Sequence, residues 1–369
     1  MNTRLIYSYM VTGHNMEYLH HLYLGALEDR SHIYVFAVPR EFEDKKDLME
    51  WKANDRIHFR YLDEYKASNR NLLLGAWYNS RLLGKVAKDT KAKEIFLVSL
   101  IDFIPFLPLF VPKGVRVAGI IYKIYLYFLE EMSWSQKIQE WLKYKVMTSS
   151  HCLKRVLILN DQESADELNR RWNTHKYRFL PDPFIPFAMG GVRDMREEMG
   201  VGKDKTIVLH IGSITHGKGS DRIFDMIDNS NSEELKDYCF VFAGVIAQSI
   251  KEEFYRRLGI CREKANIIVK DQFLNYLDLG SLVYTADKVV LPYRRIGQSS
   301  GIIAYCAQMG TPVYVPSKGL IGRLVSQFSI GACLDDFHDI HSIEVEAKAE
   351  SLYCESHTIG SFYRTILKT

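Results

Sequence analysis

Short runs of β-branched and aromatic residues alternate with helix-length amphipathic segments along the whole chain. In the first half, these apolar runs predict six strands, at residues 4–11, 32–38, 56–62, 94–100, 115–121 and 155–160. The pattern then starts again and predicts six more, at residues 206–212, 238–244, 266–273, 288–293, 311–316 and 330–334. Strands separated by helices are typical of parallel β-α-β units, whose right-handed crossovers wind an open sheet covered on both faces. The alternation therefore predicts an α/β protein.

The boundary between the two halves is predicted in the segment FLPDPFIPFAMGG. Prolines and glycines interrupt it at positions 181, 183, 186, 190 and 191, which is typical of a linker. We expect one Rossmann-like domain over residues 1–186 and a second over residues 187–350. The last segment, residues 351–369, predicts a C-terminal helix that packs back on the first domain. The simplest architecture is two tandem Rossmann-like domains facing a central cleft.

Composition and charge narrow the classes of function. Hydrophobic residues make up 47% of the 369 positions and charged residues 25%, the balance of an ordinary soluble protein. The net charge of +3 is unevenly distributed along the chain. Residues up to Pro186 include 27 Lys and Arg and 22 Asp and Glu, whereas the residues after Pro186 include 21 Lys and Arg and 23 Asp and Glu. The first half is therefore better suited to an anionic surface or substrate. The imbalance is too mild to indicate nucleic-acid binding, and the aromatic-basic motif of an RNA-binding sheet does not occur.

The chain carries no pattern typical of export or of a membrane span. Residues 95–112 have the length of a span, but Asp102 and three prolines interrupt them, so they predict a buried strand followed by an irregular loop. The N-terminal residues lack the cleavage pattern of a secretory signal, and we expect a cytoplasmic protein. Six scattered cysteines without a C-x-x-C pair predict reduced, packed thiols, and we expect no metal site.

Two loops in the second half carry residues suited to binding phosphate. In open α/β sheets, ligands bind where strands end and helix N-termini offer N–H groups. The first loop, in HIGSITHGKGSDR, has Gly212 and Ser213 at a strand end, then Lys218 between two glycines. Glycines let backbone approach a phosphate, and the lysine supplies a mobile positive charge. The spacing matches neither a P-loop nor a dinucleotide fingerprint, and a glycine turn with an exposed lysine is the alternative.

The second loop, in LPYRRIGQSSGIIAYCAQMG, opens an apolar helix with small polar residues. Ser299 and Ser300 stand where an N-cap belongs, Gly301 permits close approach, and Arg294 lies just upstream. The helix start would thus present hydroxyl and N–H groups to a ligand. A capped core helix without a ligand is the alternative.

Taken in order, these motifs resemble the C-terminal domain of GT-B glycosyltransferases, specifically the large retaining family 4. IGSITHGKG is similar to the donor loop of that family, VKDQFLNYLDLGSLVYTADKVVLPY to its base-binding segment, and SSGIIAYCAQMGTPVYVP to its donor-diphosphate helix. The resemblance extends over residues 156–325. It implies the GT-B architecture and a nucleotide-diphosphate sugar as donor. The implied reaction is transfer of a hexosyl group, with retention, to a hydroxyl of a glycan or lipid-linked glycan in cell-surface polysaccharide biosynthesis. It implies no cofactor and no metal.

Carried over position by position, the resemblance also implies roles for single residues. The residues that would contact the donor phosphates are Gly212, Ser213, Lys218, Ser299, Ser300 and Gly301. Phe273 would lie near the nucleobase. Tyr305 would contact the ribose, and it stands where many relatives have a glutamate. A second such glutamate is replaced by Gly297, and an arginine by Ser213.

The first domain offers fewer candidates, as expected if it binds a variable acceptor. Gly13, His14 and Asn15 follow the first predicted strand, and the resemblance places Gly13 and Asn15 on the acceptor side. His14 and Asp102 are the candidate catalytic residues, because each follows a strand that would end at the cleft. The alternatives are an ordinary polar helix start for His14 and a turn cap beside Pro105 for Asp102.

Two helical segments of the first domain could touch a membrane. One carries Arg81, Lys85 and Lys88 on one face, and the other carries an apolar stripe formed by Trp134, Ile138, Trp141 and Leu142. A solvated face explains the first segment and a core stripe explains the second. Peripheral attachment at the inner face of the cell membrane is the competing hypothesis, because it would suit a lipid-linked acceptor.

Two other functions remain open. A nucleotide-sugar epimerase shares this two-domain form and needs no acceptor. A non-catalytic GT-B protein that binds a glycan or a partner would explain the missing glutamates of the donor helix.

Overall fold

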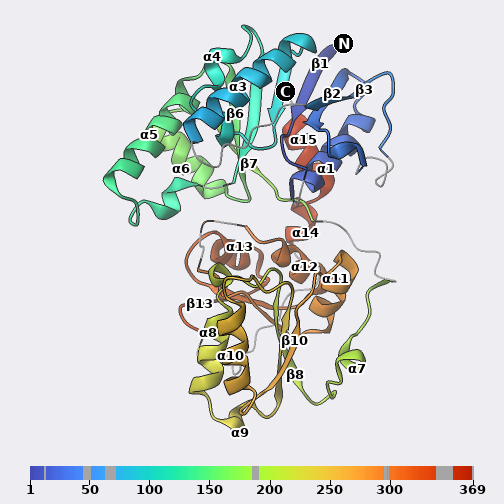
Figure 1. Cartoon of the computed structure of the whole chain (residues 1–369), viewed down its shortest axis with the longest axis vertical. Coiled ribbons are helices and arrows are strands. Elements are labelled where there is room, and N and C mark those ends of the chain that lie inside the picture. The colour runs from blue at the N-terminus through green and yellow to red at the C-terminus, as the bar shows by residue number, and fades with distance from the viewer. Residues whose placement is uncertain are drawn as a thin grey trace. The chain divides into compact units, whose positions relative to one another are not determined.

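The computed structural model describes residues 1–11, 14–44, 51–62, 72–122, 124–184, 191–294, 297, 299–337 and 352–367. The chain divides into two compact units, each built on one sheet (Figure 1). The first unit comprises Met1–Asp182 and Ile359–Thr369, and the second comprises Pro183–Thr358. The chain therefore leaves the first unit once and returns to it at the end.

The first unit contains a seven-stranded sheet in the order β3-β2-β1-β4-β5-β6-β7, and all its described strand pairs are parallel. The strands are β1 (Asn2–Tyr7), β2 (His32–Pro39), β3 (Ile57–Leu62), β4 (Glu94–Leu97), β5 (Arg116–Ile121), β6 (Leu153–Leu159) and β7 (Tyr177–Leu180). Strand order reverses between β1 and β4, as in doubly wound sheets. The seventh strand was not among the predicted ones, because its four residues run directly into Pro181.

Helices cover both faces of this sheet. One face carries α1 (His14–Glu28) and α15 (Ile359–Leu367), and the other carries α3 (Leu72–Asp89), α5 (Trp134–Ser149) and α6 (Gln162–Trp172). Helices α1 and α15 pack closely, since a Cβ on Gly25 would lie 2.7 Å from the ring of Tyr363. The predicted irregular loop after β4 contains two short helices, η1 (Ile101–Phe103) and α4 (Leu107–Phe110), and η2 (Tyr125–Phe128) follows β5.

The second unit contains a six-stranded sheet in the order β10-β9-β8-β11-β12-β13, again with parallel pairs. Its strands are β8 (Thr206–Ile211), β9 (Tyr238–Ala243), β10 (Asn266–Lys270), β11 (Lys288–Val290), β12 (Val313–Pro316) and β13 (Gly331–Leu334). Its helices are α7 (Arg196–Met199), η4 (His216–Lys218), α8 (Ser220–Asn229), α9 (Ser232–Leu235), α10 (Lys251–Cys261), α11 (Tyr276–Thr285), α12 (Gly301–Met309), α13 (Leu320–Phe328) and α14 (Leu352–Ser356). On one face, Phe224 of α8 stacks on Phe242 of β9, and Phe254 of α10 packs edge-on against both rings in the core.

The C-terminal segment forms two helices rather than one. Helix α14 belongs to the second unit and α15 to the first, with the division after Thr358. The side chain of Arg155 donates to the carbonyl oxygens of Thr365 and Ile366, at 2.9 and 2.8 Å. These bonds satisfy acceptors that the end of a helix leaves unpaired.

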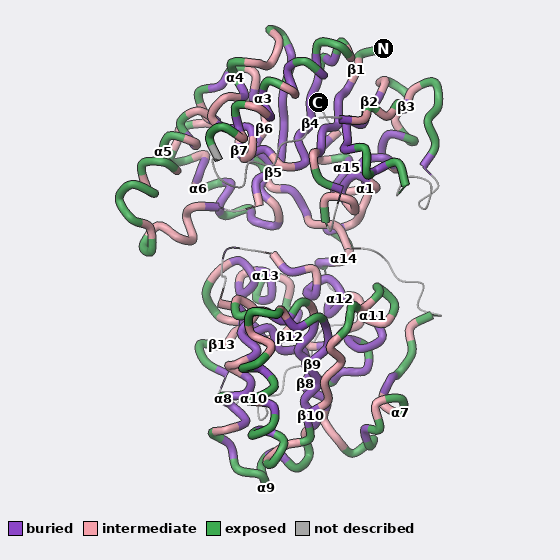
Figure 2. Tube along the Cα trace, viewed as in Figure 1, coloured by how far each residue is buried: buried purple, intermediate pink, exposed green. Residues whose placement is uncertain are grey.

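The interpretation of the α5 stripe as core is wrong. Trp134 is 78% exposed, and Ile138, Trp141 and Leu142 are each about half exposed. The tube of Figure 2 is coloured as exposed over much of α5. The helix contributes instead Tyr144 and Met147 to the core beneath it. Arg81, Lys85 and Lys88 of α3 are exposed, as a solvated face predicts.

No helix in the described part of the chain is both long and apolar enough to cross a membrane. The six cysteines all lie in that part and form no disulfide there, and Cys239, Cys261 and Cys306 are buried. Burial raises the pKa of the Cys239 thiol to about 11, so this side chain packs as a neutral group.

Candidate functional site

The candidate site of the second unit lies where its strand order reverses. Strands β8 and β11 are neighbours although β9 and β10 come between them in sequence. Because the strands are parallel, the loops after β8 and β11 leave from the same edge. These are the two loops in which the sequence predicts phosphate contacts.

Backbone contacts lock the two loops together. Gly219 adopts a φ of +73°, and a Cβ there would lie 2.1 Å from the carbonyl oxygen of Pro292. The N–H of Arg294 donates to the carbonyl oxygen of Gly217 at 3.0 Å, and its guanidinium donates to that of His216 at 3.1 Å. A glycine is therefore required at position 219 both for its conformation and for its lack of a side chain.

An ion pair joins the second loop to the first turn of α8. The guanidinium of Arg294 contacts both carboxylate oxygens of Asp221. Burial raises the pKa of Asp221, but the hydrogen bonds and charge of Arg294, together with a backbone hydrogen bond and the charge of His216, outweigh burial, so the pKa lies below its usual value. An ion pair with two contacts of this kind fixes the orientation of both side chains. It therefore holds the loop after β11 against the first turn of α8.

Tyr293 connects the two predicted phosphate contacts. The ammonium nitrogen of Lys218 lies 3.7 Å from the centroid of its ring, and its hydroxyl lies 3.1 Å from the Ser300 hydroxyl. Tyr293 is buried, and burial raises the pKa of its phenol far above neutrality. The phenol therefore stays protonated and holds Lys218 by a cation–π contact.

The start of α12 is built differently from an ordinary capped helix. Ser300 is the N-cap residue, yet within the described chain its side chain makes no capping hydrogen bond, because its hydroxyl pairs with Tyr293. The N-terminal N–H groups of a helix carry partial positive charge. Since the cap leaves them to other acceptors, the start of α12 is suited to an anion.

The glycines at the two loops leave room beside the backbone. Gly212 has a φ of +107°, and a Cβ there would lie 3.9 Å from Ile302, so the first loop approaches the first turn of α12. A Cβ on Gly301 would have no heavy atom of the described residues within 4 Å. Ser213 is exposed and Ser299 is partly exposed. Backbone at this edge is thus accessible to a ligand.

His210 lies under the two loops as a neutral group. It is buried in β8, and its Nδ1–H donates to the carbonyl oxygen of Val290 at 2.9 Å. Burial lowers the pKa of its imidazole to about 4. This bond ties the end of β8 to the end of β11, and no local pattern of residues indicates it.

The first unit has its own candidate edge, after β1 and β4. His14 begins α1; its side chain is 69% exposed and lies 3.1 Å from a carboxylate oxygen of Glu17. Asp102 lies in η1, and its carboxylate accepts a hydrogen bond from the Ser99 hydroxyl. Asn15 is partly exposed in the first turn of α1, and Gly13 lies outside the described residues.

Two aromatic residues that no sequence motif marks, Tyr18 and Tyr122, lie at the same edge. The Tyr18 hydroxyl donates to Asp182 at 2.7 Å, and its ring lies 6.2 Å from that of Tyr122. Burial and the charges of Asp182 and Asp102 raise the pKa of Tyr122. Tyr18 and Tyr122 come from two different elements, so only the fold could reveal them as neighbours.

Comparisons with known proteins place the fold. No family model matches the chain, and no curated protein matches it. A solved structure of HepE from Anabaena in complex with UDP is similar over 100% of this chain and 99% of its own, with a TM-score of 0.71 and 11% identity. The glycosyltransferase WaaG, involved in lipopolysaccharide biosynthesis, is similar over 92% and 88%, with a TM-score of 0.60 and 14% identity. UDP-GlcNAc 2-epimerase from Neisseria meningitidis, bound to UDP-GlcNAc, is similar over 100% and 99%, with a TM-score of 0.60 and 13% identity.

The chain has the GT-B fold. Two parallel α/β sheets of seven and six strands match those of GT-B glycosyltransferases along nearly the whole chain. Both transferases and epimerases occur among the similar structures. Because the sequence identities are so low, these similarities show the fold and not the reaction.

Within the GT-B fold, the two predicted nucleoside residues lie in different surroundings. Phe273 follows β10 and is 84% exposed, at the edge that also carries the loops after β8 and β11. Tyr305 is only 9% exposed in α12. The strand ladder ends at Lys270 rather than at the predicted residue 273, which leaves Phe273 in a loop.

Among the residues that the structure describes, no group of three or more His, Cys, Asp or Glu side chains is placed to hold a metal ion.

Proposed function

We propose that this protein is a glycosyltransferase that moves a hexosyl group from a nucleotide-diphosphate sugar to a hydroxyl. The observation that carries the proposal is the joining of two phosphate-type loops by Tyr293. The ring of Tyr293 contacts Lys218 and its hydroxyl contacts Ser300, so a mobile cation and a helix N-terminus are held at one edge of one sheet. This is the combination that a leaving diphosphate requires, because its negative charge grows in the transition state.

The donor occupies the second unit. Lys218 and the start of α12 contact the phosphates, with Gly212, Ser213, Ser299 and Gly301 beside them. Phe273 lies near the nucleobase and Tyr305 near the ribose. In support, HepE is solved with UDP and with UDP-glucose. A UDP-sugar is therefore the first donor to test.

The acceptor side is formed by the first unit, at the carboxyl ends of β1 and β4. His14 is exposed, its Nδ1 lies 3.1 Å from a carboxylate oxygen of Glu17, and it orients the acceptor hydroxyl. Asp102 and Asn15 are the other candidates. WaaG acts in lipopolysaccharide biosynthesis, and the acceptor proposed here is likewise a glycan or lipid-linked glycan of a cell-surface polysaccharide.

Two further properties belong to the proposal. The sugar is transferred with retention, as in family 4. Catalysis is independent of metal, because Lys218 and the start of α12 neutralise the diphosphate. Transfer should therefore continue in the presence of EDTA.

The exposed stripe of α5 supports peripheral attachment to a membrane. Trp134 and Ile138 project from a helix that also carries lysines, one of which, Lys145, lies 5.7 Å from the ring of Trp141. Tryptophan beside lysine suits the interface of a bilayer that contains anionic lipids. Such attachment, from the cytoplasmic side, would bring the protein to a lipid-linked acceptor.

A thermal-shift screen tests the donor assignment. A ligand that binds only the folded state raises the apparent unfolding temperature. We expect nucleoside diphosphates and their sugars to stabilise the wild-type protein and to have little effect on Lys218→Ala. If no nucleotide stabilises the wild type, the donor site is wrong.

A nucleotide-sugar epimerase is the second candidate, since UDP-GlcNAc 2-epimerases share the fold. Incubation with UDP-GlcNAc alone distinguishes the two functions. Isomerised donor in the absence of any acceptor would favour the epimerase, and transfer of the sugar to an added glycan would favour the transferase.

A further inference from the structure

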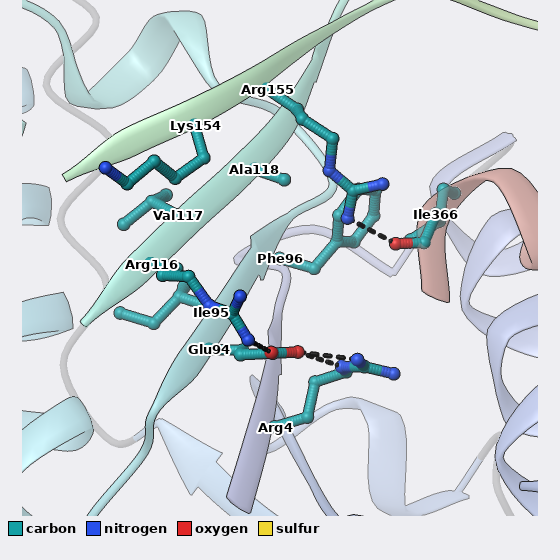
Figure 3. A pocket seen from close by; sticks show the side chains of 10 residues that line it. All are labelled: Arg4, Glu94, Ile95, Phe96, Arg116, Val117, Ala118, Lys154, Arg155 and Ile366. Atoms are coloured by element: carbon teal, nitrogen blue, oxygen red, sulfur yellow. Dashed lines mark hydrogen bonds and ion pairs between the residues drawn. The ribbon is translucent and has the colours of Figure 1, made fainter. Parts of the chain in front are cut away.

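A basic cavity lies at the amino ends of the strands of the first unit, opposite the edge that carries His14 and Asp102. Its volume is about 340 Å³, at the small end of the range of ligand pockets, about 300–1,000 Å³. Five charged side chains line it (Figure 3): Arg4 of β1, Glu94 of β4, Arg116 of β5, and Lys154 and Arg155 of β6. The lining thus carries four cations and one carboxylate.

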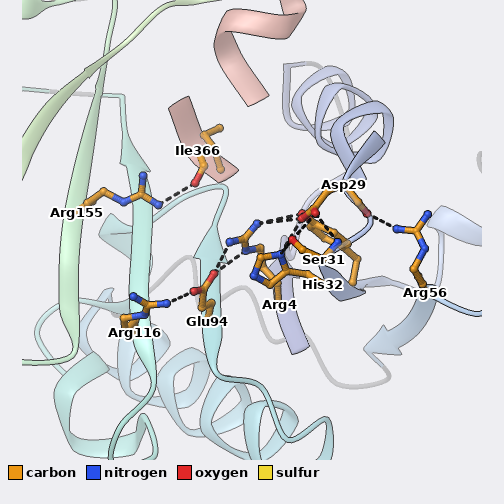
Figure 4. A network of polar contacts seen from close by, with 10 residues as sticks. Arg4, Asp29, Ser31, His32, Arg56, Glu94, Arg116, Arg155 and Ile366 are labelled. Atoms are coloured by element: carbon orange, nitrogen blue, oxygen red, sulfur yellow. Dashed lines mark hydrogen bonds and ion pairs between the residues drawn. The ribbon is translucent and has the colours of Figure 1, made fainter. Parts of the chain in front are cut away.

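The register of the sheet brings these charges together. Arg4 is paired with Glu94, and Glu94 with Arg116, across three neighbouring strands. The Nε of Arg4 donates to Glu94 at 2.7 Å, and Arg116 contacts the other oxygen of that carboxylate. Asp29 lies 3.8 Å from Arg4 (Figure 4). Even with Asp29 counted, the cations around the cavity outnumber the carboxylates.

The surroundings of Arg155 also indicate a positive potential. Its guanidinium is held by the last carbonyls of α15 and faces the cavity. Burial and the neighbouring charges of Arg4 and Arg116 lower the pKa of Arg155, although Glu94 opposes them. A bound anion would relieve this repulsion.

A second hollow adjoins the first and shares two of its cations. It has a volume of about 540 Å³ and is lined by Lys113, Arg116, His151 and Lys154, together with apolar side chains and no carboxylate. Arg116 and Lys154 therefore stand between two hollows. Within the described residues no ion pair joins Lys154 to a carboxylate. Lys154 is therefore not part of the ion-pair network that neutralises Glu94.

We propose that this cavity binds an organic phosphate ester, with the phosphate on Arg116 and Lys154 and an apolar part against Phe96 and Ile366. Arginine and lysine are suited to phosphate because they combine a two-point donor with a point charge. Phe96 and Ile366 line the same cavity and favour an ester with an apolar group over inorganic phosphate. The site lies in the first unit and does not rest on the proposed transferase function.

Calorimetric titration of the full chain with phenyl phosphate tests the proposal, with phenol as the uncharged control. We expect the wild type to bind phenyl phosphate and not phenol. Lys154→Gln and Arg116→Gln should each weaken binding roughly tenfold or more, since a hydrogen bond to a charged group contributes about 1.5–3 kcal/mol. Lys154 is exposed and its substitution leaves the Arg4–Glu94–Arg116 contacts in place, so Lys154→Gln should fold normally.

Two matched variants locate the bound phosphate. Lys85→Gln removes an exposed lysine of the same unit that does not line the cavity, and Lys218→Ala removes the proposed donor contact. Both should bind phenyl phosphate as the wild type does. Loss of binding in Lys218→Ala, or equal binding in the wild type and in Lys154→Gln, would overturn the proposal.

Vesicles distinguish the two sources of such an ester. Sedimentation with phosphatidylglycerol vesicles that depends on Lys154 would assign a lipid headgroup, and binding of phenyl phosphate without Lys154-dependent sedimentation would assign a soluble ester. If neither probe binds, the proposal is wrong.

Discussion

The ammonium nitrogen of Lys218 lies 3.7 Å from the centroid of the Tyr293 ring. Lys218 follows β8 and Tyr293 follows β11, so this contact crosses the point where the strand order of the second unit reverses. A cation–π contact contributes about 0.5–2 kcal/mol, enough to favour one position of a flexible lysine without making its charge unavailable. The arrangement can hold a cation ready for an anionic ligand.

Lys218→Ala should strongly reduce sugar transfer while leaving the fold intact. Removing one preorganised charge from a site where negative charge develops costs about 10²- to 10³-fold in kcat. The measurement is kcat with a UDP-sugar, together with the unfolding temperature. Lys203→Ala, at an exposed lysine of the same unit, is the control and should be fully active. Wild-type activity in Lys218→Ala would contradict the donor-loop assignment.

Gly301→Ala should weaken the binding of UDP without lowering the stability of the fold. No described heavy atom lies within 4 Å of the added Cβ, and alanine in a helix is favoured over glycine by about 0.5–1 kcal/mol. We expect unchanged or slightly higher stability and at least tenfold weaker binding of UDP. Gly259→Ala in α10 is the matched control, since its Cβ is equally unobstructed. The two variants should gain similar stability, but only Gly301→Ala should bind UDP more weakly. If both variants bind UDP equally well, the phosphate does not bind at the start of α12.

Gly219→Ala should destabilise the second unit by more than about 2 kcal/mol. Its φ of +73° disfavours any side chain, and the new Cβ would lie 2.1 Å from the Pro292 oxygen. Urea unfolding followed by circular dichroism measures the loss. Gly200→Ala, at a φ of +69° with no described atom nearby, isolates the conformational part and should cost less. Similar losses in both variants would show that the contact with Pro292 is unimportant.

His210 should make stability depend on pH. Its pKa is lowered from 6.5 to about 4 by burial, so the unfolded chain binds a proton that the folded chain does not. Stability is therefore full above pH 6.5 and falls as the pH drops towards 4, by up to about 3 kcal/mol from this group. His210→Asn keeps an N–H donor for Val290 but does not titrate. Plots of unfolding free energy against pH should be shallower for the variant between pH 6.5 and 4, and parallel plots would refute the assignment.

Trp134→Ser with Ile138→Ser should weaken binding to vesicles that contain anionic lipids. Both side chains are exposed, so their removal should leave the unfolding temperature unchanged. Sedimentation with vesicles measures the effect, and we expect the bound fraction to fall several-fold. Leu352→Ser, at a 65% exposed leucine of α14, is the control. Unchanged sedimentation of the double variant would exclude the α5 stripe from membrane contact.

Much of the fold was predictable because its signals are local. Hydrophobic runs at strand period, separated by helical periods, predicted twelve of the thirteen strands in the described part of the chain and the two parallel sheets. Predicted strands extended too far at their carboxyl ends. At β8, for example, Gly212 has a φ of +107° and turns the backbone out of the strand ladder. The two candidate loops of the second unit were also located from the sequence, because each begins where a predicted apolar strand ends.

The amino-acid sequence by itself determined the class of fold, the positions of the loops after β8 and β11 and the amphipathic helices, since each depends on residues close together in the chain. Only the tertiary structure decided how these pieces meet. Ser300 is the N-cap residue, as predicted, but its hydroxyl pairs with Tyr293 and makes no capping bond to the described helix. The α5 stripe was predicted as core, but it faces solvent. Arg4 and Arg116 meet at Glu94 only through the order and register of β1, β4 and β5. Hydrophobic periodicity marks that a segment has an apolar face, but the partner of that face is set by packing between elements distant in sequence.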